Sequence, residues 1–251
     1  MTESNRPRSI SEIAAATNRQ NDGASIRYSI GTLVRDRAQY ELMHSTFVNG
    51  GFSGPDCEYL FVDNTGAEQT FAYQGLNSIL NAARGTYVIL CHQDVRIVDD
   101  DRAVLDARLD ELGRVDPNWG LAGNAGGIAS GKLAIRITDP QFDNVRMGDL
   151  PAKVMSLDEN FILVRSDARL AFSNDIFSFH FYGADICLNA DMRGYGAYVV
   201  DFHLHHLSAG EHSAAFFQSQ KEFEAKWTRA LRRRVMQTTC AQFRLKGSLD
   251  I

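Results

Sequence analysis

The N-terminal half of the chain alternates three times between a run of strand-forming residues and a pattern with helical spacing. The strand candidates begin near Ile26, Tyr59 and Tyr87, and each ends in polar residues before the helical pattern starts. Parallel strands need a crossover connection, which is usually a helix, so this alternation predicts a mostly parallel central sheet with flanking helices. The chain is therefore expected to be an α/β protein.

The C-terminal half changes character and predicts a mixed α+β region. Residues 159–167 and 197–206 read as strands, 131–144 as a hairpin arm or loop, 183–196 as a helix, and 222–237 as an amphipathic helix. We expect three parts: a polar N-terminal tail over 1–25, one domain over 26–212, and a C-terminal amphipathic helix and tail over 213–251.

The composition of the chain limits the binding partners and the cellular compartment that we expect for the protein. The chain has 251 residues, 44% of them hydrophobic, and a net charge of -5 without a basic excess, so nucleic acid is not an expected partner. Its four cysteines lie far apart, which favours reduced thiols in a cytoplasm. No signal peptide and no run of about 18 apolar residues is evident, so we expect a soluble or peripheral protein.

Polar side chains gather where two of the predicted strands end. Asp63 closes one strand, and His92, Gln93 and Asp94 close the next. The carboxyl ends of parallel strands face a shared crevice, and a carboxylate there can hold a divalent cation that neutralises a diphosphate. The alternative is that Asp94 begins a turn while His92 packs on the core.

The order of these elements carries a family resemblance. "FVDN", "AARGTYVILCHQDV" and "YGADICLNADMRGYGAYVV" follow one another as in the GT-A fold, and residues 26–212 resemble the family-2-like inverting nucleotide-sugar glycosyltransferases. Two departures stand out. The usual D-x-D motif is His92-Gln93-Asp94, which keeps only the final acid, and the acidic pair before the later helix is Ala184-Asp185.

The resemblance implies a set of donor-binding residues. Asp94 would bind Mn2+ or Mg2+ bridging the diphosphate of a nucleotide-sugar, with Gln93 or His92 touching its ribose or phosphate. Asp63 would contact the nucleobase, most often uracil, which makes a UDP-sugar the expected donor. Two further residues would line the same nucleotide pocket: Thr32 and Asp36.

Three histidines lie close together in "DFHLHHLSAG". In a strand, His203 and His205 share one face and His206 points to the other, so the three cannot bind one ion without a bend. The resemblance makes His206, in the pattern H-x-S-x-G, the second protein ligand of the metal. Two alternatives remain: partly exposed histidines at a strand edge, or a metal hydrolase built on His203 and His205, which would need further ligands.

Asp185 stands at the start of a predicted helix and has two interpretations. An acid in the first turn stabilises a helix by about 0.3–1 kcal/mol without any catalytic role. The family instead has a general base here, which would take the proton of the acceptor hydroxyl in a single displacement that inverts the anomeric carbon. The nucleoside diphosphate would then leave without a general acid, because the cation stabilises its charge.

These features predict a metal-dependent inverting glycosyltransferase that moves a single sugar to a glycan or lipid-linked acceptor hydroxyl, in polysaccharide biosynthesis. The alternative is a catalytically silent sugar-nucleotide or glycan-binding module. A nucleotidyltransferase is disfavoured, because "SIGTLVRDR" lacks a glycine- and arginine-rich phosphate loop. The basic C-terminal helix favours simple packing, since Glu222 and Glu224 dilute its charge. The alternative is peripheral contact with anionic lipid at the inner face of a membrane.

Overall fold

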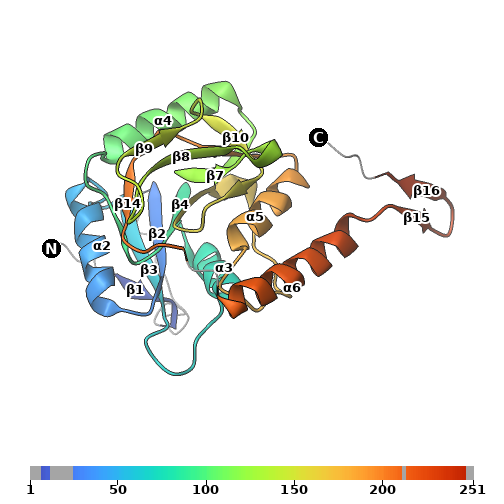
Figure 1. The fold of residues 1–251 in the computed structure, drawn as a ribbon, viewed down its shortest axis with the longest axis horizontal. Coiled ribbons are helices and arrows are strands. Elements are labelled where there is room, and N and C mark those ends of the chain that lie inside the picture. The colour runs from blue at the N-terminus through green and yellow to red at the C-terminus, as the bar shows by residue number, and fades with distance from the viewer. Residues whose placement is uncertain (1–6, 12–24, 211–212, 247–251) are drawn as a thin grey trace. The chain divides into compact units, whose positions relative to one another are not determined.

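The computed structural model describes residues 7–11, 25–210 and 213–246 (Figure 1). The chain divides into two compact units, one ending at Gly210 and the other beginning at residue 211. The larger unit contains two sheets and four long helices within the described residues. The smaller unit contains one helix and a hairpin.

The predicted βαβ alternation is confirmed by the first three long strands of the larger unit. Strand β2 lies between β3 and β4 and pairs with both in parallel, with Tyr28 opposite Cys57 on one side and Tyr87 on the other. Helices α2 and α3 make the crossovers. The bounds are β2 Tyr28–Val34, α2 Arg37–Asn49, β3 Cys57–Asp63, α3 Ala72–Ala82 and β4 Tyr87–Cys91.

The large sheet continues on both sides of these strands, in the order β1-β3-β2-β4-β12-β6-β13-β10. Strand β12 is antiparallel to both neighbours, whereas β13 returns parallel to β6, so the fold is mixed as expected. The added strands are β1 Arg8–Ser9, β6 Trp119–Gly123, β10 Ala152–Val154, β12 Phe161–Arg165 and β13 Gly196–Val199.

Two parts of this sheet differ from the expectation. Arg8 and Ser9 fall within the predicted polar tail, yet they pair with β3, and the Arg8 guanidinium binds the buried carboxylate of Glu58. The short glycine-rich segment from Trp119, which was not among the expected strands, forms a fully buried inner strand. A side chain at Gly123 would meet Phe161 and Leu157, so glycine is needed at this position. The short apolar run "IAAA" at 13–16, which could form a helical turn within the polar tail, lies outside the described residues.

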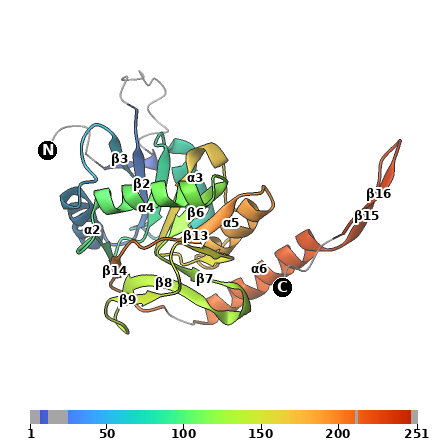
Figure 2. The ribbon, with the colours of Figure 1, turned by 90° about the horizontal axis from the view of Figure 1, so that it is seen from above.

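A second sheet lies as a layer beside the first (Figure 2), in the order β11-β7-β8-β14-β5, with β9 paired to β8. The predicted strand over 197–206 is interrupted at 200–203, so its first part belongs to the large sheet and its second part to this one. The strands are β5 Val95–Arg96, β7 Ala125–Gly127, β8 Leu133–Thr138, β9 Val145–Met147, β11 Ser156–Leu157 and β14 Leu204–His206.

Helices cover both faces of the large sheet. Alternate β2 residues such as Ile30 join the apolar core with α2 and with α4, Arg102–Val115. On the opposite face, Gly31 allows Ile79 of α3 to approach closely, since a Cβ there would lie 2.3 Å from its methyl group. Helix α5, Tyr182–Asp191, lies on the α3 side, where Tyr182 and Tyr73 meet edge to face.

The smaller unit begins with α6, Ala214–Leu231, whose N-terminus is capped by Ser213. We expected the helix to continue through Val235, but the chain turns into an antiparallel hairpin of β15, Arg234–Gln237, and β16, Gln242–Leu245. The turn is set by Thr238, whose hydroxyl accepts hydrogen bonds from the backbone of Cys240 and Ala241.

Candidate functional site

The tip of β4 is held against β14 by the short strand β5. Strand β5 pairs antiparallel with β14, with Val95 opposite His206, and the backbone N–H of Leu207 donates to the carbonyl of Asp94. This register places a carboxylate oxygen of Asp94 3.5 Å from Nε2 of His206. The two predicted metal ligands, about 110 residues apart in sequence, therefore lie side by side.

His92 joins this pair from the same strand tip. Its Nδ1 lies 3.4 Å from Nε2 of His206, and its Nε2 lies 2.8 Å from the hydroxyl of Tyr182. That hydroxyl also lies 3.0 Å from the backbone carbonyl of Glu159, which can only accept a hydrogen bond. Tyr182 therefore donates to Glu159 and accepts from His92, which leaves the lone pair of Nδ1 facing His206 and Asp94.

The charges in this cluster favour metal ligation. Burial and the nearby His206 lower the pKa of His92, so its imidazole is neutral at physiological pH. Burial alone would raise the pKa of Asp94, but hydrogen bonds from His206 and Ser208 hold it well below the usual range. A neutral imidazole and an ionised carboxylate are the forms in which these side chains bind metals.

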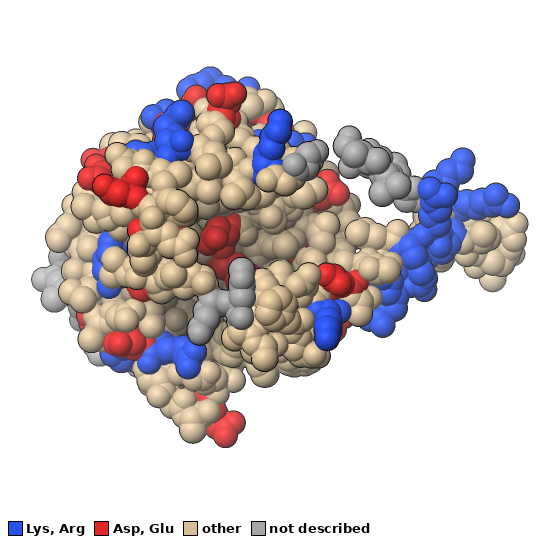
Figure 3. Space-filling view, viewed as in Figure 1, with Lys and Arg blue, Asp and Glu red and all other residues tan. Residues whose placement is uncertain are grey.

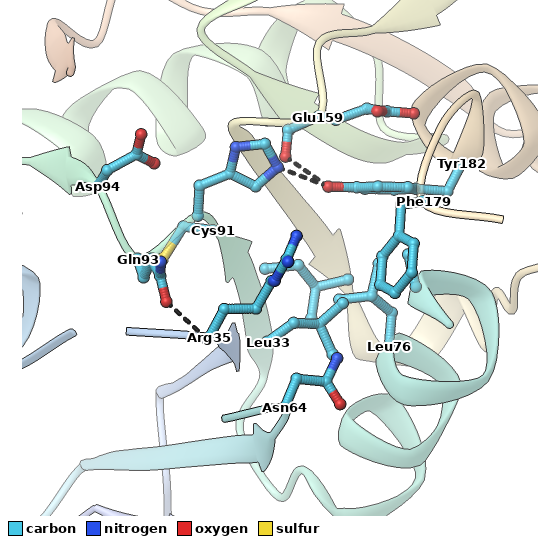
Figure 4. A pocket seen from close by; sticks show the side chains of 13 residues that line it. Leu33, Arg35, Asn64, Leu76, Cys91, Gln93, Asp94, Glu159, Phe179 and Tyr182 are labelled. Carbon is cyan, nitrogen blue, oxygen red and sulfur yellow. Dashed lines mark hydrogen bonds between the residues drawn. The ribbon is translucent and has the colours of Figure 1, made fainter. Parts of the chain in front are cut away.

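A cavity opens beside the cluster, at the carboxyl ends of β2, β3 and β4. Figure 3 shows a hollow in this face of the molecule with acidic side chains in it. In Figure 4 the guanidinium of Arg35 projects into the cavity on the side of Tyr182, and His92 also lines this cavity. The amide oxygen of Gln93 accepts hydrogen bonds from the backbone N–H groups of Arg35 and Asp36, which fixes the loop that carries Arg35.

Three residues expected in the nucleotide pocket do not line this cavity. Thr32 is 1% exposed, and its hydroxyl contacts the sulfur of Cys91 inside the protein. Asp36 caps α2 by accepting from Ala38 and Gln39. The carboxylate of Asp63 accepts from Thr65 and pairs with Arg37, while the next residue, Asn64, lies in the cavity wall.

Asp185, expected as the general base, also lies outside the cavity wall. It is fully buried, and its carboxylate accepts hydrogen bonds from the backbone and hydroxyl of Ser173 and from the amide of Asn189. In this position Asp185 ties α5 to the segment before it.

Glu159 is the carboxylic acid that lines the cavity besides Asp94. It precedes β12, and a carboxylate oxygen accepts a hydrogen bond from the backbone N–H of Gly183 at the start of α5. Burial and the neighbouring Asp158 raise the pKa of Glu159 to about 8. A carboxyl group with a pKa near neutrality can exchange a proton during a reaction.

Sequence reasoning missed Arg35, Glu159 and Tyr182. Arg35 is the first polar residue after β2, so the rule that sites gather at strand ends could have found it. Glu159 and Tyr182 carry no such signal. They reach the cavity because the antiparallel β12 brings its start to the tip of β4, with Phe161 opposite Cys91.

Comparison with solved structures identifies the class of fold. S. aureus TarS matches 81% of this chain at 12% identity with a TM-score of 0.54, and this chain spans 40% of the TarS chain. The mannosyltransferase PcManGT from Pyrobaculum calidifontis, solved with GDP-Man and Mn2+, matches 88% of this chain and 70% of its own at 14% identity, with a TM-score of 0.54. The chain has the GT-A fold of glycosyltransferases.

A protein of Fuscovulum blasticum described as "ATP synthase subunits region ORF 6" is a closer relative in sequence. It is 34% identical over 232 residues, which cover 90% of this chain and 93% of that protein. The chain belongs to the family of this protein. No family model matches the sequence. None of the helices within the described residues has the length and hydropathy of a membrane-spanning helix.

Proposed function

We propose that this protein is a metal-dependent inverting glycosyltransferase that uses a nucleotide-sugar donor. The observation that carries the proposal is the convergence of His92 Nδ1, an Asp94 carboxylate oxygen and His206 Nε2 beside the cavity of a GT-A fold. Related support comes from the mannosyltransferase of the same fold, whose structure contains GDP-Man and Mn2+.

The three side chains fit a divalent ion such as Mn2+. Ligand atoms that each lie about 2.1 Å from one ion stand roughly 3–3.5 Å apart, and the spacings around His206 Nε2 are 3.4 and 3.5 Å. Tyr182 supplies the outer hydrogen bond that orients a ligating histidine. Bound there, the ion would neutralise the charge that develops on the diphosphate leaving group.

The cavity wall supplies groups for the rest of the donor. The guanidinium of Arg35 suits a phosphate oxygen, because its planar fork can donate two hydrogen bonds at once. Asn64 lies in the cavity wall, where its amide bonds the backbone of Thr70, and Asp63 would reach a nucleobase if Arg37 released it. Our preferred nucleobase is uracil, and our preferred donor is therefore a UDP-sugar.

Two carboxylates compete for the role of general base. Asp185 is the residue predicted from the sequence, but its oxygens bind Ser173 and Asn189. Glu159 lies in the cavity wall, and its pKa near 8 lets it accept a proton from an acceptor hydroxyl. We therefore prefer Glu159 for this role.

Release of the nucleoside diphosphate tests the proposal. The purified protein is incubated with UDP-sugars and GDP-sugars in the presence of Mn2+, and free UDP or GDP is measured, since water can replace the unknown acceptor at a slow rate. We expect release that stops on addition of EDTA. Metal-dependent UDP binding without any release, with acceptor mixtures also inactive, would instead identify a silent sugar-nucleotide-binding module.

The smaller unit suggests where a lipid-linked acceptor would be met. Residues 213–246 contain eight Lys and Arg against two Glu, a net charge of +6 in a chain of net charge -5. One face of the hairpin carries Met236, Phe243 and Leu245, all exposed. Exposed apolar side chains among basic ones suit an anionic lipid surface, so we propose peripheral membrane contact through this unit.

Vesicle sedimentation tests the membrane contact. The protein is expected to sediment with vesicles containing anionic phosphatidylglycerol and not with neutral phosphatidylcholine vesicles. Because each basic residue near such a surface contributes about 1 kcal/mol, replacing Arg232 and Arg233 by Glu should weaken binding by about 10-fold or more. The matched control is Arg114→Glu in α4. Equal sedimentation of both variants would remove the smaller unit from this role.

A further inference from the structure

A second group of side chains of the types that bind metals lies on the other face of β14. His203 Nδ1 and His205 Nε2 each lie 3.0 Å from the same carboxylate oxygen of Asp99. All three ligand atoms lie within 4.8 Å of one another. The imidazoles of His203 and His205 share one side of the chain, whereas His206 points to the cluster with Asp94, as the alternation of a strand requires.

The fold brings Asp99 to these histidines through the same pairing that forms the first cluster. Strand β5 runs antiparallel to β14 with Arg96 opposite His205, and the chain after β5 carries Asp99 and Asp100. Asp100 holds the backbone at this point, because its carboxylate accepts the N–H of His203 at 2.6 Å. The three side chains are therefore positioned by backbone contacts as well as by their own bonds.

The outer hydrogen bond expected of a ligating histidine is present. His203 Nε2 lies 3.0 Å from the hydroxyl of Thr138, on the strand that pairs in parallel with β14. With Nδ1 on a metal, Nε2–H would donate to Thr138, whose hydroxyl can donate in turn to Asp143. His203 itself is almost fully buried, so its ring cannot turn away freely.

We propose that Asp99, His203 and His205 form a second divalent metal site of the zinc type, separate from the nucleotide cavity. Two imidazoles and a carboxylate form a ligand set that zinc uses in proteins, with a water molecule as the fourth ligand. Two ligands of one tetrahedral zinc stand about 3.3 Å apart, so an opening of a few tenths of an ångström from the observed 3.0 Å would admit the ion.

The position of the site lets a metal ion enter from solvent and determines which elements a bound ion would hold together. The side chain of Asp99 is 56% exposed, so an ion can enter from solvent. An ion held there would link the segment after β5 to β14. These are the two elements that carry Asp94 and His206, so occupancy would stabilise the register on which the first cluster depends. Arg136, a cation whose charge acts on His203, is paired with Asp201.

Counting bound zinc in the metal-stripped full-length protein tests the site. Because zinc can also bind the first cluster, the test compares variants: His205→Ala and Asp99→Asn should each bind one ion per chain fewer than the wild type. Asp94→Ala should lose only the other ion. Asp110→Asn, an exposed acid in α4, is the matched control and should bind as the wild type does.

A stability readout separates metal binding from a simple ion pair between Asp99 and a protonated histidine. In the Asp94→Ala background, zinc should raise the melting temperature, and the added Asp99→Asn change should abolish that shift while circular dichroism shows a folded protein. Unchanged zinc stoichiometry in both His205→Ala and Asp99→Asn, or no zinc-dependent shift in the Asp94→Ala background, would overturn the proposal.

Discussion

Asp94→Ala and His206→Ala are each expected to weaken Mn2+-dependent binding of UDP by about 100-fold or more. Loss of an outer-shell partner already costs roughly 10–100-fold in metal affinity, and these residues are proposed as direct ligands. The Asp94 carboxylate also supplies the negative charge of the cluster, because His92 and His206 bind metals as neutral imidazoles. Calorimetry with UDP, with and without Mn2+, measures the effect.

The control for this pair is Asp110→Ala, which removes an acid that is exposed on α4. Its affinity for UDP with Mn2+ should equal that of the wild type. Tyr182→Phe should show a smaller loss, of about 10-fold, because it leaves the three ligands in place and removes the hydroxyl that orients His92 and bonds the carbonyl of Glu159. If both ligand variants kept wild-type affinity, the metal site would have to lie elsewhere.

Glu159→Gln is expected to lower turnover by about 10²–10⁴-fold while UDP affinity stays nearly unchanged. The amide keeps the size and hydrogen bonding of the side chain but cannot take the acceptor proton. Since the pKa of Glu159 lies at about 8 in the free protein, wild-type kcat/KM should rise with pH through this value as the carboxylate forms. Glu159→Gln should lose this rise.

Asp185→Asn is the matched comparison, because it makes the same chemical change in a buried carboxylate outside the cavity wall. We expect it to destabilise the fold by about 1–3 kcal/mol through weaker bonds to Ser173, with turnover per folded molecule close to wild type. A large loss of turnover in folded Asp185→Asn, with active Glu159→Gln, would return the base role to Asp185.

The part of the site that could be predicted from the sequence follows from the geometry of parallel strands and from the alternation of side chains along a strand. The polar tips after the strands ending at Asp63 and Cys91 follow from parallel βαβ geometry, which sends both to one edge of the sheet. The split of the histidines between two faces follows from strand alternation alone. Both inferences depend on local patterns in the chain.

The rest depends on pairings between distant segments, which local patterns do not encode. Nothing near Tyr182 predicts that its hydroxyl meets His92, since this contact arises from the antiparallel return of β12 and the position of α5. Asp99 was not predicted as a partner of His203 and His205 because it lies in the connection between β5 and α4. The role of Asp185 was taken from a motif, which does not encode the bonds of its buried carboxylate to Ser173 and Asn189.

The secondary structure expected from the sequence differs from the observed one where small residues or turn chemistry decide the backbone conformation. Trp119–Gly123 has too many glycines to resemble a strand, yet an inner position between β12 and β13 requires small side chains. Beyond Leu231 the helical spacing to Val235 was misleading, since the hydroxyl of Thr238 closes a hairpin turn. In both segments, tertiary contacts or a single side-chain bond overrode the residue pattern.

Anomalous diffraction at the manganese edge, from crystals grown with UDP and Mn2+, shows directly whether His92, Asp94 and His206 hold the ion beside the nucleotide. We expect an anomalous peak bounded by these three side chains, in contact with the diphosphate and with Arg35 on the nucleotide. A nucleotide bound in the cavity without a peak between these three side chains, or a peak and nucleotide located elsewhere, would contradict the proposed metal site.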